Sequence, residues 1–175
     1  HQQVQAGGIY ACGISPYAAT HSRTARIGNA DFRRAGRTGG DAVMKKKLSE
    51  VCKFQYGYPF DSSLFSDIDG TPVIRIRDII RGFSETKTTE ACSTDYIVDN
   101  GDILIGMDGE FNIAKWKGGK AFLNQRVCKL MPFDVNRDYI FYHLPKILKS
   151  IEEKTSFATV KHLSAKQLNS IYIDI

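Results

Sequence analysis

Long hydrophobic runs are missing from this sequence of 175 residues. No apolar stretch approaches the ~20 residues that a membrane-spanning helix requires. The first residues also lack the apolar region that is typical of a secretory signal. We therefore expect a cytoplasmic protein that has no membrane partner.

Close pairs of metal ligands are missing as well. The four cysteines are far apart in the sequence and form no C-x-x-C pair, and the four histidines are equally scattered. A structural zinc site normally includes at least one close pair of ligands. The sequence predicts reduced thiols, no metal site and no cofactor.

The familiar catalytic motifs are absent too. There is no G-x-x-x-x-G-K-[ST] phosphate loop, no dinucleotide fingerprint, and no N-P-P-Y or D-P-P-Y motif of an amino-methyltransferase. No Ser, Cys or Thr is placed near a His in a way that indicates an activated nucleophile. We expect a protein that binds a partner and has no catalytic residues of its own.

One group of acids leaves a nuclease as a minor alternative. Asp99, Asp102, Asp108 and Glu110 precede Lys115, and a metal-dependent nuclease needs carboxylates and a Lys around one divalent ion. In the usual pattern the second acid and the Lys are two residues apart. Glu110 and Lys115 are five apart, on opposite faces of a straight strand. We expect Asp99, Asp102 and Asp108 to bond their own backbone in turns.

Composition and charge divide the chain into two parts. The apolar fraction of 42% and charged fraction of 25% are ordinary for a globular domain, but the net charge of +5 is uneven. Residues 1–43 contain Arg without Lys and have no sustained apolar period. We interpret 1–43 as a non-native or disordered N-terminal segment, with a native arm as the alternative, and 44–175 as the folded domain.

The folded part is predicted to be α+β: a twisted, mostly antiparallel sheet with long loops and a few peripheral helices. Glycine-bounded apolar runs predict strands at 103–105, 111–116 and 121–130, and Val73–Arg77 alternates as a half-buried strand with Arg75 and Arg77 outward. Helical spacing covers 139–151, where Pro145 should kink or restart the helix. Ser164 is a candidate N-cap for a helix over 165–169, and a strand is expected at 171–175.

Basic and amide side chains of the folded part suggest nucleic-acid binding. Arg, Lys, Asn and Gln are the residues that read base edges and contact phosphates. An ordinary solvated sheet face is the alternative explanation. The candidate DNA-binding residues are Arg75, Arg77, Arg81, Asn112, Lys115, Lys117, Lys120 and Arg126, and a wider set adds Asn124 and Gln125.

Several motifs carry a resemblance to a known family. The segments Gly57-Tyr-Pro-Phe-Asp-Ser-Ser-Leu-Phe65 and Gly70-Thr-Pro-Val-Ile-Arg-Ile-Arg-Asp-Ile-Ile-Arg-Gly82 resemble the start of a target recognition domain of type I restriction-modification specificity subunits. Gly101-Asp-Ile-Leu-Ile105 with Gly106, Asn124-Gln-Arg-Val127 and Thr159–Ile173 fit the same domain. The resemblance covers about Leu48 to Ile175 in the expected order, and residues 1–43 have no counterpart in it.

The resemblance implies a function and a set of partners. In that family each recognition domain binds one half of a split duplex DNA target and directs methyltransferase (modification) and restriction subunits, without catalytic residues of its own. The sequence ends before the proline-rich start of the spacer helix, so it is expected to represent one recognition domain without its spacer. The recognition part of a fused restriction-methyltransferase enzyme and a diverged protein-interaction module remain alternatives.

Overall fold

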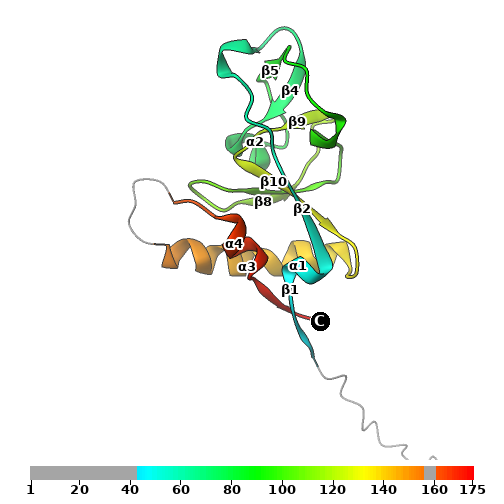
Figure 1. The fold of residues 1–175 in the computed structure, drawn as a ribbon, viewed down its shortest axis with the longest axis vertical. Helices are drawn as coiled ribbons and strands as arrows, with labels where there is room; N and C mark the ends of the chain where they lie inside the picture. Colours follow the sequence, from blue (N-terminus) through cyan, green and yellow to red (C-terminus); the bar gives the residue numbers. More distant parts are fainter. Residues whose placement is uncertain (1–42, 156–160) are drawn as a thin grey trace, which may run out of the picture. The chain divides into compact units, whose positions relative to one another are not determined.

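The computed structural model describes residues 43–155 and 161–175 (Figure 1). From the sequence, residues 1–43 are interpreted as a separate segment. All of these residues except Val43 lie outside the described range. In the described part, no helix has the length and apolar character needed to cross a bilayer.

The strands of the described residues form three sheets. A two-stranded sheet pairs β1 (Lys45–Lys47) with β11 (Tyr172–Asp174). The four-stranded sheet has the order β2 (Cys52–Tyr56), β10 (Val127–Pro132), β7 (Ile103–Gly106), β8 (Ile113–Lys115). The five-stranded sheet has the order β3 (Phe65–Ser66), β5 (Lys87–Thr88), β4 (Thr71–Ile74), β9 (Ala121–Leu123), β6 (Ile97–Val98).

The helices are short except for one. They are α1 (Leu48–Val51), α2 (Ile76–Arg81), α3 (Arg137–Lys154) and α4 (Ala165–Asn169), with single 3₁₀ turns at Ser62–Leu64 and Thr94–Tyr96. Within the part of the chain that the structure describes, all strand pairs are antiparallel except β4 with β9. The α+β class is confirmed.

The central strand β7 is buried on both faces. Ile103 and Ile105 belong to a hydrophobic cluster with α3 and α4, whereas Leu104 belongs to a second cluster with α2, β9 and Trp116. Successive strand residues point to opposite faces, so one strand joins both clusters. Figure 1 shows α3 along one side of the β10–β8 sheet and α2, β9 and β4 on the other.

The predicted strand at 121–130 is divided in two, which corrects the expectation of a single sheet. Asn124–Arg126 interrupt it, so that β9 pairs with β4 and β6 whereas β10 pairs with β2 and β7. The turn is closed locally by the Val127 N–H, which donates to the Asn124 carbonyl at 2.9 Å. The central stretch therefore contributes to two sheets.

The prediction of a strand with Arg75 and Arg77 on its outer face is wrong. Strand β4 ends at Ile74, and the chain turns into α2. Asp78, three residues after the N-cap, accepts the Arg75 backbone N–H at 2.9 Å and so caps the helix. Gly82 ends it with φ of 78°. Arg75 is therefore the N-cap residue and Arg77 is helical.

The C-terminal predictions are mostly confirmed. Helix α3 includes the predicted 139–151 and begins two residues earlier, because the Asn136 side chain accepts the N–H groups of Asp138 and Tyr139. The helix does not restart at Pro145. Its inner stripe of Ile140, Leu144 and Leu148 is fully buried. Helix α4 has the predicted bounds and its Ser164 cap, and β11 forms at the predicted final strand.

Candidate nucleic-acid interface

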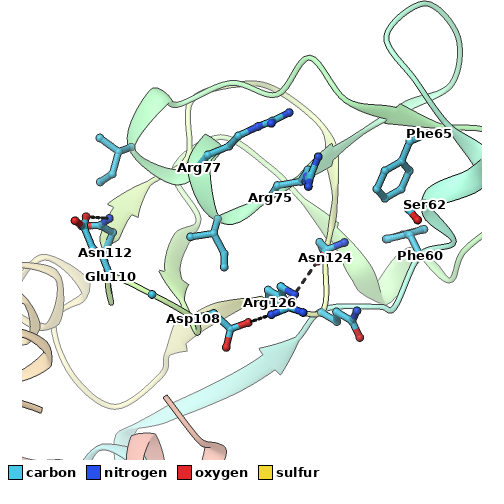
Figure 2. A pocket seen from close by; sticks show the side chains of 14 residues that line it. Phe60, Ser62, Phe65, Arg75, Arg77, Asp108, Glu110, Asn112, Asn124 and Arg126 are labelled. Carbon is cyan, nitrogen blue, oxygen red and sulfur yellow. Dashed lines mark hydrogen bonds and ion pairs between the residues drawn. The ribbon is translucent and has the colours of Figure 1, made fainter. Parts of the chain in front are cut away.

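A concave surface with a volume of about 740 Å³ lies where four segments meet: the segment that follows β2, α2 with its N-cap, the turn after β7, and the β9–β10 turn. We call it the arginine groove, after Arg75, Arg77 and Arg126 in its walls (Figure 2). Its other lining residues are Phe60, Ser62, Phe65, Ile76, Ile80, Asp108, Gly109, Glu110, Asn112, Asn124 and Gln125.

Arg75 and Arg77 line one wall from the start of α2. Arg77 is partly engaged, since its Nη2 donates to Thr86 Oγ1 at 3.2 Å and its Nε lies 3.7 Å from Asp78 Oδ1. The Arg75 side chain is exposed and makes no ion pair within residues 43–155 and 161–175. Arg75 therefore keeps its five N–H donors available for a ligand.

The β9–β10 turn is fixed to the segment that follows β2. The Tyr58 N–H donates to the Leu123 carbonyl at 2.8 Å, and the Gln125 N–H donates to the Tyr58 carbonyl at 3.0 Å. A Cβ atom at Gly57 would lie 2.1 Å from the Asn124 carbonyl oxygen, so only glycine allows this approach. Two of the sequence motifs, Gly57-Tyr58 and Asn124–Val127, are thus in direct contact and hold the turn rigidly.

Asp108 is the most buried polar residue of the groove. Its carboxylate forms an ion pair with Arg126 through Oδ2 and contacts His162 Nδ1 through Oδ1 at 2.6 Å. Burial alone would raise the pKa of Asp108, but the hydrogen bonds from His162 and Arg126 outweigh it and hold the pKa below its ordinary value. The carboxyl is therefore ionised at neutral pH.

The expectation for the turn acids is confirmed for Asp102 and wrong for Asp108. Asp102 Oδ2 accepts the Asp99 N–H at 3.0 Å, as a turn acid does. The Asp108 carboxylate instead bonds distant side chains. His162 was missed, because a lone histidine has no periodic signal. The only available pointer was its place in the last segment of the family resemblance.

Four of the predicted DNA-binding residues lie outside the groove. Lys115 pairs with Asp138 at 2.5 Å and lies over the Phe141 ring. Arg81 pairs with Glu85 at 3.0 Å and stacks on Phe83. The other two, Lys117 and Lys120, are exposed on the turn after β8.

The structure brings together the remaining predicted residues, including the two of the wider set. Arg75, Arg77, Asn112 and Arg126 line one surface, with Asn124 and Gln125 beside them. Guanidinium and amide groups form the paired hydrogen bonds that distinguish base edges, and the arginines also bind phosphate. The exposed Ile80 adds an apolar contact of the kind that a thymine methyl accepts. The arrangement is suited to binding a polyanion with a patterned polar edge.

Comparison with known proteins shows the family of the chain. Residues 41–175 match the model of the type I restriction modification DNA specificity domain, so the chain belongs to that family. A curated relative, the type I restriction enzyme EcoBI specificity subunit of Escherichia coli, is 38% identical over 138 residues, which is 77% of this chain and 29% of the relative. The chain thus spans less than a third of that subunit.

Solved structures share the fold at low sequence identity. The HsdS subunit from Thermoanaerobacter tengcongensis superposes with a TM-score of 0.58 at 17% identity, covering 82% of this chain and 35% of that one. The type I restriction-modification S subunit from M. genitalium gives a TM-score of 0.57 at 12% identity, over 77% and 35%. A structure of type I R-M system assembly and conformational transition gives 0.59 at 18%, over 80% and 36%.

Proposed function

We propose that residues 44–175 form a target recognition domain that binds duplex DNA sequence-specifically through the arginine groove. The observation that carries the proposal is the convergence of Arg75, Arg77 and Arg126 with three amide side chains on one concave surface. The convergence occurs in a chain of a DNA specificity family. The proposed contribution is binding, with no catalytic residue.

The groove residues are proposed to have two different roles, contact with bases and contact with phosphates. Arginine and amide side chains that reach base edges set the sequence preference, at about 1–3 kcal/mol for each good paired contact. Contacts to phosphate set the affinity and its dependence on salt. The unpaired Arg75 is the proposed base reader of the α2 wall, and Arg77, which also bonds Thr86, is a phosphate contact.

We also propose that the domain acts within a larger assembly. The relative from E. coli is a specificity subunit of a restriction enzyme. By analogy, this chain would bring methyltransferase and restriction subunits to one half of a split DNA target. The domain would then determine where modification and cleavage occur while the partner subunits perform the chemistry.

The test is a selection from a pool of duplexes that contain a randomised segment. The 175-residue chain should enrich one short sequence, and its affinity for that duplex should fall steeply as salt is raised. A methyltransferase subunit of a related system is added in a parallel arm. Enrichment of no sequence in either arm would contradict the proposal and favour a protein-interaction module.

A further inference from the structure

The ion pair between Asp108 and Arg126 lies in the surface that is proposed to bind DNA. Only 8% of the surface of Asp108 is exposed, and the groove around it contains three arginines, three amide side chains and one other acid, the exposed Glu110. A negative charge at that place repels phosphate and lowers affinity for any DNA sequence. Its presence therefore needs an explanation other than affinity.

The carboxylate is held from both sides. His162 Nδ1 lies 2.6 Å from Asp108 Oδ1, and the backbones of Asp108 and His162 form a bridge. The Gly109 N–H donates to the Lys161 carbonyl at 2.8 Å, and the Leu163 N–H donates to the Met107 carbonyl at 2.7 Å. Asp108 thus has a fixed position, and its second oxygen is directed to Arg126.

Arg126 is held at both its backbone and its guanidinium. Its carbonyl accepts the Met107 N–H at 2.9 Å, and its N–H donates to Asn124 Oδ1 at 3.3 Å. A dashed line in Figure 2 marks the pair of Arg126 with Asp108. Only Nη1 takes part in this pair, and 59% of the Arg126 side chain is exposed. The remaining N–H donors can therefore face a ligand from a fixed direction.

We propose that Asp108 and His162 are positioning residues that orient Arg126 to read a base edge, and that Asp108 lowers non-specific phosphate affinity while it raises selectivity. The inference deepens the proposed function and rests on it. A planar guanidinium that is fixed in advance loses less freedom when it forms paired bonds to a guanine edge. The same guanidinium, if released, binds any phosphate within reach.

The experiment compares variants in the duplex selection and in binding to one unrelated duplex. Asp108→Asn should lose the preference at one target position by about fivefold or more. It should bind the unrelated duplex about two- to fivefold more tightly, because one negative charge has been removed. The Arg126→Ala variant should lose the base preference at the same position. Adding Asp108→Asn to Arg126→Ala should cause no further loss of base preference. The opposite changes in selectivity and affinity are not expected of a merely structural residue.

Asp138→Asn is the matched control. It removes the same charge from the same domain but affects the Lys115 ion pair, outside the groove. It should leave every base preference unchanged. If it removes the same preference as Asp108→Asn, the effect is one of net charge and the proposal is overturned.

His162→Gln keeps the test valid if Asp108→Asn fails to fold, as thermal unfolding would show. A partial loss of preference at the Arg126 position supports the positioning role, and an unchanged preference overturns it. If the unaltered chain enriches a sequence but Asp108→Asn retains all its preferences, the present inference alone fails. If the unaltered chain enriches nothing, the proposed function itself fails.

Discussion

The hydrophobic cluster around α3 and the arginine groove differ in what holds their residues in place. Leu144 and Leu148 of α3 are fully buried and held by apolar packing. Arg126 in the groove is 59% exposed and held by a carboxylate and by backbone bonds. Close packing makes stability sensitive to each buried methylene, whereas exposed polar side chains contribute little to stability. The exposed side chains of the groove can therefore be replaced with little loss of stability.

The same difference is seen in the titratable groups. Burial raises the pKa of the Cys52 and Cys128 thiols to about 12 in the cluster around α3. In the groove, hydrogen bonds from His162 and Arg126 keep the pKa of Asp108 low in spite of its burial. Burial thus favours the neutral form of these two thiols, whereas hydrogen bonds favour the ionised form of the Asp108 carboxyl.

The largest effect is expected in the cluster. Leu144→Ala should lower the free energy of unfolding by about 2–5 kcal/mol, because it leaves a cavity in the stripe that α3 buries. Denaturant titration measures this loss. Thiol labelling of Cys52 and Cys128 should accelerate in parallel, since both are buried and react on unfolding. The exposed Tyr142 is the control, and Tyr142→Ala should change stability by less than about 0.5 kcal/mol.

Gly57→Ala should affect both the stability of the domain and its DNA preference. The added Cβ would meet the Asn124 carbonyl oxygen at 2.1 Å, so the β9–β10 turn must shift. We expect a loss of about 1–3 kcal/mol in stability, together with a changed DNA preference at the Asn124–Arg126 side. Gly119→Ala, with positive φ but open space around it, should reduce stability and leave the selected DNA sequence unchanged. An unaltered selection with Gly57→Ala would contradict the rigid-turn argument.

Arg75→Ala should change recognition with little effect on stability, since the side chain is exposed. If Arg75 reads a base, the discrimination at one position falls by about 1–3 kcal/mol, measured as the ratio of affinities for matched and mismatched duplexes. Lys115→Ala is the control for recognition, because the Lys115 side chain forms an ion pair with Asp138 and is not expected to contact a base. A selected sequence that does not respond to Arg75→Ala would show that the α2 wall contacts no base.

The smallest effect is expected for Lys117 and Lys120. Both are exposed and do not line the groove. The double replacement with Ala should leave the selected sequence unchanged and should alter the salt slope by less than the ~0.9 that one phosphate contact contributes. A steep loss of affinity would extend the DNA-facing surface to the turn after β8.

Local sequence patterns were sufficient for several elements. Helices over 139–151 and 165–169 and the β7 strand followed from apolar spacing and from Ser164 as a cap. Helix α2 was missed, because Val73–Arg77 alternates like a strand while Ile76 and Ile79 have helical spacing. The Asp78 cap and the close approach of Ile76 and Ile79 to Gly106 favour the helix. A five-residue pattern cannot decide between two periods.

The sequence by itself determined the α+β class, the family and the kinds of side chain that suit DNA recognition. Only the tertiary structure decided that Arg75, Arg77 and Arg126 share one surface and that Lys115 is occupied elsewhere. It also joined Asp108 to Arg126 and to His162, which lie 18 and 54 residues further along the chain. Periodicity reports which face of an element is buried, whereas contacts between distant segments depend on how whole elements pack.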